Sequence, residues 1–269
     1  MMAVTQGATP LVAVEGLAVR YRGSPEVLRE IRFSVAAGDT VGICGESGSG
    51  KSTLLRALLG LVPIARGTVR WHGRELAGFR AADWSRLRRC AQLVFQDPFA
   101  SLDPRMRIAA ILAEPLDVHR SDLDRPARQA RVAAQLTRVG LDANVLTRFP
   151  HELSGGQCQR VAIARAMILE PEVLVCDEPV SALDVSIQAQ IIGLLATLQR
   201  EAGTTLIFVS HNLAVVRRLC RRVIVMQGGR IVEEGEAKDV LSAPRHAYTR
   251  QLVASIPEVP RSGRVAQVS

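Results

Sequence analysis

The sequence is poor in aromatic residues and has no long hydrophobic run. Aromatic residues make up 4% of its 269 residues, and the longest apolar stretch is about Ala57 to Ala65. A membrane-spanning helix needs roughly 20 apolar residues. The first residues, Met1 to Gln6, also lack the charged and apolar regions of a secretory signal. We therefore expect no membrane-spanning helix and a cytosolic location.

Cysteines are few and scattered. The five of them form no C-x-x-C pair, so the sequence indicates neither a zinc site nor a disulfide framework. We expect them to be small buried hydrophobic residues. Their positions are Cys44, Cys90, Cys158, Cys176 and Cys220.

Basic residues are in excess, with a net charge of +8 and clusters at Arg86–Arg89 and Arg217–Arg222. Such patches can attract nucleic acid, but no aromatic platform and no DNA-reading module accompanies them. Solvated basic faces are common, and they also favour a surface near anionic lipid. We expect no nucleic-acid partner.

The hydrophobic pattern predicts an α/β fold. Residues 11–37 alternate apolar and polar, which is typical of an antiparallel β-layer. Unbroken apolar runs at 173–176, 205–209 and 223–226 favour parallel strands covered on both faces. A helix from Val185 to Ala202, ended by Gly203, would join the first two runs in a βαβ unit.

Residues from roughly 100 to 170 have a helical pattern that is interrupted by prolines. The sequence therefore predicts one composite domain over 1–269. Its parallel-sheet core and β-layer cover about 8–97 and 170–240, an inserted helical subdomain covers about 98–169, and a short tail covers 241–269.

A phosphate-binding loop follows the predicted strand Asp39–Cys44 and precedes a predicted helix from Thr53 to Gly60. Residues 45–52 (GESGSGKS) match G-x-x-x-x-G-K-[ST] in this context. Its glycines let backbone N–H groups surround phosphate oxygens, and the helix N-terminus faces the same anion. Lys51 would reach the β- and γ-phosphates, and the Ser52 hydroxyl would ligate Mg²⁺. The predicted nucleotide-binding residues here are Gly45, Glu46, Ser47, Gly48, Ser49, Gly50, Lys51, Ser52 and Thr53.

Two adjacent carboxylates end a buried strand in Glu172–Pro179 (EVLVCDEP). Neighbouring side chains at a strand end point in different directions, so Asp177 and Glu178 can have different roles. Asp177 suits a position near Mg²⁺, and Glu178 can accept a proton from the attacking water or orient it.

Gln96 and His211 follow two further apolar runs. A neutral amide at Gln96 could ligate Mg²⁺ or bind the water. A neutral imidazole at His211 could donate to the γ-phosphate. Either residue alone is weak evidence for a catalytic role. Their order and spacing relative to the other motifs support these assignments.

A second anion-binding helix start is predicted at Leu153–Gln157 (LSGGQ). The helix that follows would place Val161, Ala164 and Ile168 on one face. Two such sites with one set of catalytic carboxylates are hard to reconcile unless the second site serves the nucleotide of another subunit.

The order P-loop, Gln96, LSGGQ, EVLVCDEP, Ser181–Asp184 and His211 resembles the ABC transporter ATPase family over nearly the whole chain. The resemblance implies a P-loop NTPase (RecA-like) core and a head-to-tail dimer with a paralogous subunit or a second copy. ATP would be enclosed between the P-loop of one subunit and the LSGGQ of the other, with Tyr21 stacking on adenine. The residues implied to contact the partner's ATP are Ser154, Gly155, Gly156, Gln157 and Asp184.

Residues 94–105, 177–191 and 244–257 look like the oligopeptide, dipeptide and nickel importer ATPases of that family. This branch implies two ATPase subunits on the cytoplasmic face of the membrane, beneath two permease subunits and supplied by an extracytoplasmic binding protein. The segment 96–115 would meet the permease coupling helices.

Three positions depart from the family pattern: Cys158 stands where Arg or Gln is usual, Asn212 where Asp is usual, and Ala247 where Pro is common. Only 12 residues follow Pro257, fewer than in many peptide-importing members and nearer to nickel-type ones, which weakly favours a metal or a metal chelate as cargo. The transported molecule does not touch this subunit, so peptides and nickel chelates both stay open.

Two alternatives to transport fit the sequence less well. A DNA-maintenance ATPase of the same superfamily would carry a long coiled coil or zinc insertions between P-loop and LSGGQ, whereas about a hundred residues without either intervene here. A GTPase would need a guanine-reading N-K-x-D element. The sequence favours an ATP-hydrolysing importer subunit.

Overall fold

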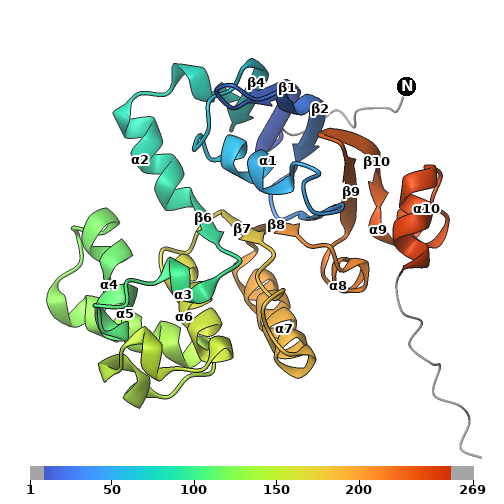
Figure 1. The fold of residues 1–269 in the computed structure, drawn as a ribbon. Coiled ribbons are helices and arrows are strands. Elements are labelled where there is room, and N and C mark those ends of the chain that lie inside the picture. The colour runs from blue at the N-terminus through green and yellow to red at the C-terminus, as the bar shows by residue number, and fades with distance from the viewer. Residues whose placement is uncertain (1–8, 256–269) are drawn as a thin grey trace, which may run out of the picture.

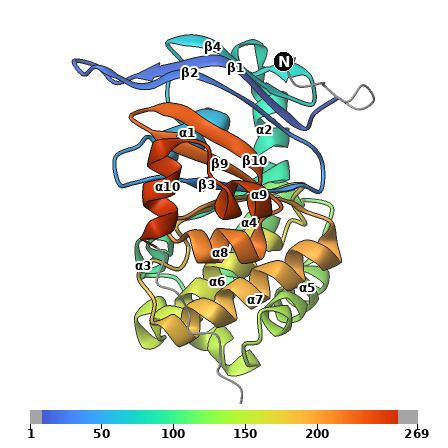
Figure 2. The ribbon, with the colours of Figure 1, turned by 90° about the vertical axis from the view of Figure 1, so that its right-hand side faces the viewer.

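The computed structural model describes residues 9–255. The predictions for Met1 to Gln6 and for the tail beyond Pro257 lie outside these residues. Figures 1 and 2 show an antiparallel sheet at the top, a second sheet beneath it, and a group of helices at the bottom.

The upper sheet is the predicted β-layer. Its strands run in the order β2-β1-β4-β5, and all of its pairings are antiparallel. It comprises β1 (Val12–Arg20), β2 (Glu26–Val35), β4 (Arg66–Trp71) and β5 (Arg74–Glu75). A short 3-10 turn, η1 (Leu76–Gly78), and helix α2 (Ala81–Cys90) lead from it to the second sheet.

The central sheet has the order β10-β9-β3-β8-β7-β6. Five of its strands are parallel: β3 (Thr40–Cys44), β6 (Ala91–Val94), β7 (Val173–Asp177), β8 (Thr205–Val209) and β9 (Arg222–Gln227). The runs predicted as doubly covered strands are β7, β8 and β9, so that prediction is confirmed. The edge strand β10 (Arg230–Glu236) is antiparallel to β9 and was not predicted.

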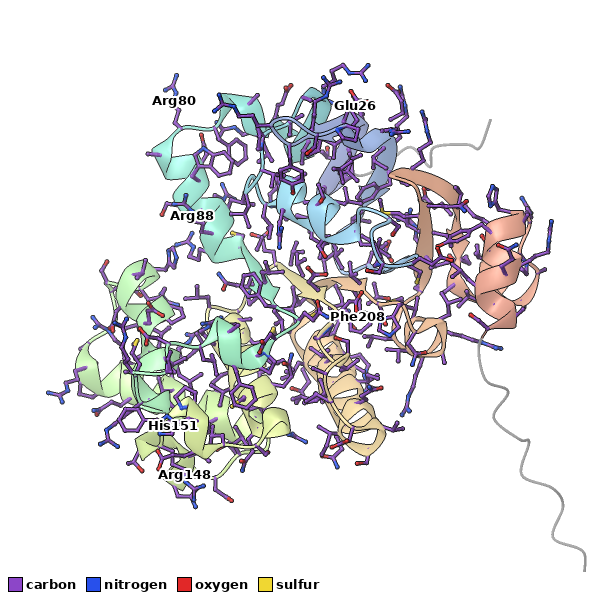
Figure 3. The ribbon with its side chains drawn as sticks, viewed as in Figure 1. Glu26, Arg80, Arg88, Arg148, His151 and Phe208 are labelled. Carbon is purple, nitrogen blue, oxygen red and sulfur yellow. The ribbon has the colours of Figure 1, made fainter. Side chains whose placement is uncertain are left out.

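Each face of the central sheet has its own core. Helix α1 (Lys51–Leu58) fills the space toward the β-layer with Leu54, Leu55 and Leu58, and it begins two residues before the predicted start. Helices α7 (Val185–Ala202), α8 (Leu213–Leu219) and α9 (Ala237–Ser242) contribute to the core on the other face. Phe208 of β8 is fully buried there, near the centre of the molecule in Figure 3.

Helix α7 confirms the predicted βαβ connection. It has the predicted bounds, and Gly203 ends it in the left-handed conformation with φ 63°. The last described helix, α10 (Ala247–Ala254), lies at the edge of the molecule beside β10 (Figure 1).

The helical group lies between β6 and β7 in sequence. It contains α3 (Pro98–Ser101), α4 (Ile108–His119), α5 (Arg125–Arg138), the 3-10 turns η2 (Ala143–Thr147) and η3 (Pro150–Glu152), and α6 (Gly155–Met167). The sequence predicts one buried apolar face on α6, but the structure buries more of this helix than one face. Its buried residues lie all round the helix, because α3, α4, α5 and α7 all contact it.

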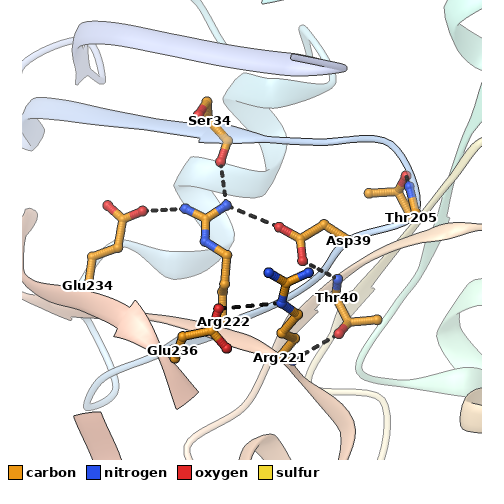
Figure 4. A network of polar contacts seen from close by, with 9 residues as sticks. Ser34, Asp39, Thr40, Thr205, Arg221, Arg222, Glu234 and Glu236 are labelled. Carbon is orange, nitrogen blue, oxygen red and sulfur yellow. Dashed lines mark hydrogen bonds and ion pairs between the residues drawn. The ribbon is translucent and has the colours of Figure 1, made fainter. Parts of the chain in front are cut away.

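A polar network joins the two sheets beside the strand that carries the P-loop (Figure 4). The Arg222 guanidinium donates to the Ser34 carbonyl of β2 at 2.9 Å and to the Asp39 carboxylate at 3.1 Å. The same side chain is paired with Glu234 of β10. These contacts tie the residue before β3 and the strand β9 of the central sheet to β2 of the upper sheet.

The cysteines behave largely as predicted. Four are buried, Cys90 is partly buried, and all five are free thiols. Burial raises the pKa of the Cys158 thiol to about 11, which keeps it protonated and unreactive at neutral pH.

Candidate nucleotide-binding site

The P-loop has a backbone that only glycine accommodates at its two ends. A Cβ atom on Gly45 would lie 2.2 Å from the Met226 carbonyl oxygen, and one on Gly50 would lie 2.7 Å from Leu28. Gly50 also has φ 101° where α1 begins. The loop is therefore pressed against β9 on one side and β2 on the other.

Lys51 lies folded over this loop. Its side chain is only 5% exposed, and its Nζ donates to the carbonyl oxygens of Gly45 and Glu46, both at 2.8 Å. The ammonium is also 3.9 Å from a carboxylate oxygen of Glu178. A buried cation held mainly by neutral carbonyl groups is well placed to bind an incoming anion.

Ser52 and Asp177 face each other although they lie 125 positions apart. The Ser52 hydroxyl donates to Asp177 Oδ1 at 3.1 Å. Burial raises the pKa of the Asp177 carboxyl, while the hydrogen bond from Ser52 opposes that rise.

This hydroxyl and carboxylate are hard oxygen donors of the kind Mg²⁺ prefers. No group of three or more His, Cys, Asp or Glu side chains that could hold a metal ion occurs within residues 9–255. Mg²⁺ commonly takes one or two protein ligands together with phosphate and water, so the pair fits it.

Glu178 and Asp177 contact different partners, which agrees with the expectation that these neighbouring carboxylates can have different roles. One carboxylate oxygen of Glu178 lies 2.9 Å from His211 Nδ1, and the other faces Lys51. Its backbone has φ 47°, a left-handed conformation that is uncommon outside glycine and recurs at functional sites. The Glu178 N–H donates to the Val209 carbonyl at 3.1 Å, which ties this turn to β8.

A cavity of about 340 Å³ brings most of the predicted residues together. It is lined by Val27, Ser47, Gly48, Gly50, Lys51, Ser52, Thr53, Gln96, Glu178 and His211. The remaining loop residues, Gly45, Glu46 and Ser49, lie outside this lining. The Tyr21 hydroxyl is 3.4 Å from Thr53 Oγ1, at the end of the loop where the helix starts.

The LSGGQ residues form a separate helix start. The Ser154 hydroxyl accepts from the Gln157 N–H at 3.3 Å, and the Gln157 side chain accepts from the Ser154 N–H at 3.0 Å. This capping box satisfies two backbone donors at the start of α6.

Gly155 and Gly156 lie against the start of α7, next to Leu183 and Ile187, and Asp184 is the residue before that helix. Within the described chain, the cavity beside Lys51 is lined neither by residues 154–157 nor by Asp184.

Sequence reasoning missed two contributors to the site. Val27 of β2 lines the cavity, and nothing in an alternating strand pattern distinguishes it. The Tyr248 hydroxyl of α10 accepts from the Glu46 N–H at 2.8 Å. The stretch 244–257 was recognised as typical of one transporter branch, and that was the available signal.

Comparison with known proteins gives consistent matches. The "ABC transporter" family model matches residues 28–181, and the "Oligopeptide/dipeptide transporter, C-terminal region" model matches residues 232–268. The chain is 46% identical to the oligopeptide transport ATP-binding protein OppF of Escherichia coli, over 96% of this chain and 80% of that protein. It is 52% identical to OppF of Salmonella typhimurium, over 82% of this chain and 66% of that protein.

Among solved structures, the dimeric ATP-binding cassette MJ0796 bound to ADP and Pi superposes with a TM-score of 0.76 at 29% identity. The superposition covers 84% of this chain and 98% of that one.

Proposed function

Because the chain belongs to the ABC transporter family of ATP-binding proteins, we propose that the cavity beside Lys51 is its ATP site. The chain is an ABC importer ATPase subunit, and its relatives do not support a role in DNA maintenance. The observation that carries the proposal is the meeting of the P-loop residues Lys51 and Ser52 with Asp177, Glu178 and His211 from the ends of two other strands.

The chain's own groups would hold the triphosphate. Lys51 can exchange its two carbonyl partners for phosphate oxygens, while the N–H groups of the loop and the start of α1 face the same charge. We propose that Tyr21, whose hydroxyl is 3.4 Å from Thr53 Oγ1, stacks on adenine. Ser52, Asp177 and Gln96 would hold Mg²⁺, which when bound neutralises charge on the phosphates.

Glu178 is the proposed general base. Its carboxylate lies between Lys51 and His211 at the cavity, where it can take a proton from water directed at the γ-phosphate. His211 contacts Glu178 through Nδ1, and because a carboxylate only accepts, His211 would donate from Nε2 to the phosphate only with hydrogen on both ring nitrogens.

A second subunit would complete the site. The capped start of α6 lies outside the cavity of its own chain, and its backbone N–H groups would bind an anion held by another chain. We propose a head-to-tail dimer, with a paralogous subunit or a second copy, in which residues 154–157 and Asp184 of one chain contact ATP held by the other. The dimeric structure of the ATP-binding cassette MJ0796 supports this arrangement.

Permease subunits are the proposed membrane partners. Within residues 9–255 no helix has the length and apolar character to span a membrane. A groove of about 420 Å³ lies near Gln96 and presents the exposed side chains of Leu61 and Phe95. We propose that the permease coupling helices dock here and along residues 96–115, at the cytoplasmic face, with an extracytoplasmic binding protein as an indirect partner.

Peptides are the proposed cargo, since the relatives are named for oligopeptide and peptide import. Titration of the cognate binding protein with short peptides and with nickel complexes distinguishes the two cargo classes that the sequence left open. Tight binding of nickel complexes without peptide binding would reject the peptide proposal.

The ATP site is tested by the two lysines of the chain, Lys51 and Lys238. Equilibrium binding of MgATP to the full chain is measured for Lys51→Ala and for Lys238→Ala, an exposed position on α9. We expect Lys51→Ala to lose at least roughly tenfold in affinity, since it removes a charge-assisted contact to phosphate, and Lys238→Ala to bind normally. Equal affinities in the two variants would reject the site.

A further inference from the structure

One tyrosine hydroxyl connects the C-terminal helix α10 to the P-loop. Tyr248 follows Glu46 by 202 positions, yet its hydroxyl accepts from the Glu46 backbone N–H at 2.8 Å. Only 4% of Tyr248 is exposed. Its ring is therefore enclosed by the protein while its polar end reaches the loop.

Glu46 is restrained on both of its backbone groups. Its N–H is bound by Tyr248, and its carbonyl oxygen accepts from Lys51 Nζ at 2.8 Å. The Gly45 carbonyl, on the peptide unit that carries the Glu46 N–H, also accepts from Lys51 at 2.8 Å. A shift of this peptide would move a group that holds the Lys51 ammonium.

Tyr248 itself is held in place by the residues before it. The Glu233 carboxylate of β10 accepts from the N–H groups of Arg245 and His246, at 2.8 and 3.1 Å. His246 Nδ1 then accepts from the Tyr248 N–H at 3.2 Å and caps α10. Burial raises the pKa of the Tyr248 hydroxyl, so it stays protonated at neutral pH.

The chain contains only two tyrosines, and their hydroxyls contact the P-loop or the first turn of the helix that follows it. Tyr21 contacts Thr53 at the helical end, and Tyr248 contacts Glu46 at the other end. Neither tyrosine lines the proposed nucleotide cavity. Tyr21 contacts Thr53, which lines the cavity, whereas Tyr248 contacts Glu46, which does not. A role for Tyr248 must therefore act through the loop.

We propose that Tyr248 is a positioning residue: its hydroxyl fixes the Gly45–Glu46 peptide in the conformation that presents Lys51, and the C-terminal region thereby sets the affinity for ATP. The inference rests on the proposed ATP site. It assigns to the β10–α10 region a function at the nucleotide site of its own chain.

The first test is Tyr248→Phe, which keeps the buried ring and removes the hydroxyl. We expect the Kd for MgATP, and the KM in the reconstituted transporter, to rise by roughly 2- to 10-fold, the value of one hydrogen bond, while kcat stays within about twofold. Gln251→Ala, at an exposed position on the same helix, is the matched control and should leave both constants unchanged.

The second test does not depend on activity. Full chain labelled with 3-fluorotyrosine has two ¹⁹F signals, which Tyr21→Phe assigns. Because Lys51 must leave the Glu46 carbonyl to reach phosphate, MgATP should shift the Tyr248 signal in the wild type, and this shift should be absent in Lys51→Ala.

The outcomes separate the two proposals. Unchanged Kd and KM in Tyr248→Phe, a fall in kcat without a change in KM, or a Tyr248 signal that ATP does not move would overturn the positioning role. Normal ATP binding in Lys51→Ala would instead reject the ATP site itself.

Discussion

At the scale of single residues, Glu178 stands out because its surroundings combine a cation, an imidazole and a strained backbone. It lies 2.9 Å from His211 and 3.9 Å from Lys51, with φ 47°. A carboxylate held this firmly at the wall of the cavity can take up a proton without reorganising.

Replacing Glu178 with Gln should therefore slow turnover while ATP binding persists. We expect phosphate release by the reconstituted transporter to fall by roughly 10²-fold or more, because the amide cannot accept the proton of water. An ATP-bound dimer should accumulate, measurable by size-exclusion chromatography. Glu75→Gln, at an exposed position, serves as control. Near-normal turnover in Glu178→Gln would refute the role of this carboxylate.

Asp177 should stabilise the fold less than an uncharged residue would. Its pKa is raised by burial, so the folded protein binds this proton more tightly than the unfolded chain does. The contribution of this group to stability therefore grows as pH falls from neutrality through the raised pKa, and shrinks as pH rises.

Asp177→Asn should accordingly raise Tm at pH 7 by roughly 1–3 °C, an increment of the order of 1 kcal/mol, while weakening Mg²⁺-dependent ATP binding. Scanning calorimetry without nucleotide at pH 7 and at pH 5 checks the sign. The gain should be smaller at the lower pH, and a lower Tm at pH 7 would contradict this account.

At the scale of elements, a cap explains one departure from the family pattern. Asn212 precedes α8, and its side-chain oxygen accepts from the N–H groups of Ala214 and Val215, at 3.0 and 3.4 Å. An Asp carboxylate would make the same bonds, so either residue can start this helix directly after His211.

Asn212→Ala should destabilise the protein by about 1 kcal/mol, since it removes this cap, whereas Asn212→Asp should be neutral or stabilising through the helix dipole. Urea unfolding of the full chain measures both variants. Equal stabilities of the Ala and Asp variants would show that the cap contributes nothing.

At the scale of the whole molecule, the proposed site is divided between two chains. Lys51 and residues 154–157 occupy separate parts of one subunit, so each chain would provide half of two composite sites. This division allows a complementation experiment between two inactive variants.

Lys51→Ala removes the phosphate ligand, and Gly155→Asp adds a repelling carboxylate at the start of α6. A Cβ on Gly155 would make ordinary contacts, 3.4 Å from Leu183, and an acidic residue in a first helical turn is favourable, so the fold should persist.

If the subunit pairs with itself, each variant alone should be inactive, and an equimolar mixture should recover about a quarter of wild-type ATPase activity through mixed dimers with one intact site. ATPase assays on the mixture, with circular dichroism of each variant as the folding control, provide the measurement. Substantial activity of Gly155→Asp alone would argue against a shared site.

Local patterns anticipated much of this architecture. The alternation in 11–37 and the unbroken run at 205–209 correspond to strands, and α7 has the predicted bounds. The edge strand β10 was missed because its residues are half-buried and mostly polar, and an edge position does not require an apolar run. The nearly complete burial of α6 was also missed, since several helices that are distant in sequence cover it.

By itself, the sequence determined the chemistry of this protein: the P-loop, the carboxylate pair and LSGGQ are short contiguous motifs whose spacing specifies their local geometry. Only the tertiary structure decided which distant groups meet. Ser52 reaches Asp177 across 125 positions, and Glu46 reaches Tyr248 across 202. Such contacts depend on the strand order β10-β9-β3-β8-β7 and on helix packing, which arise from burial of the whole chain and not from any local pattern.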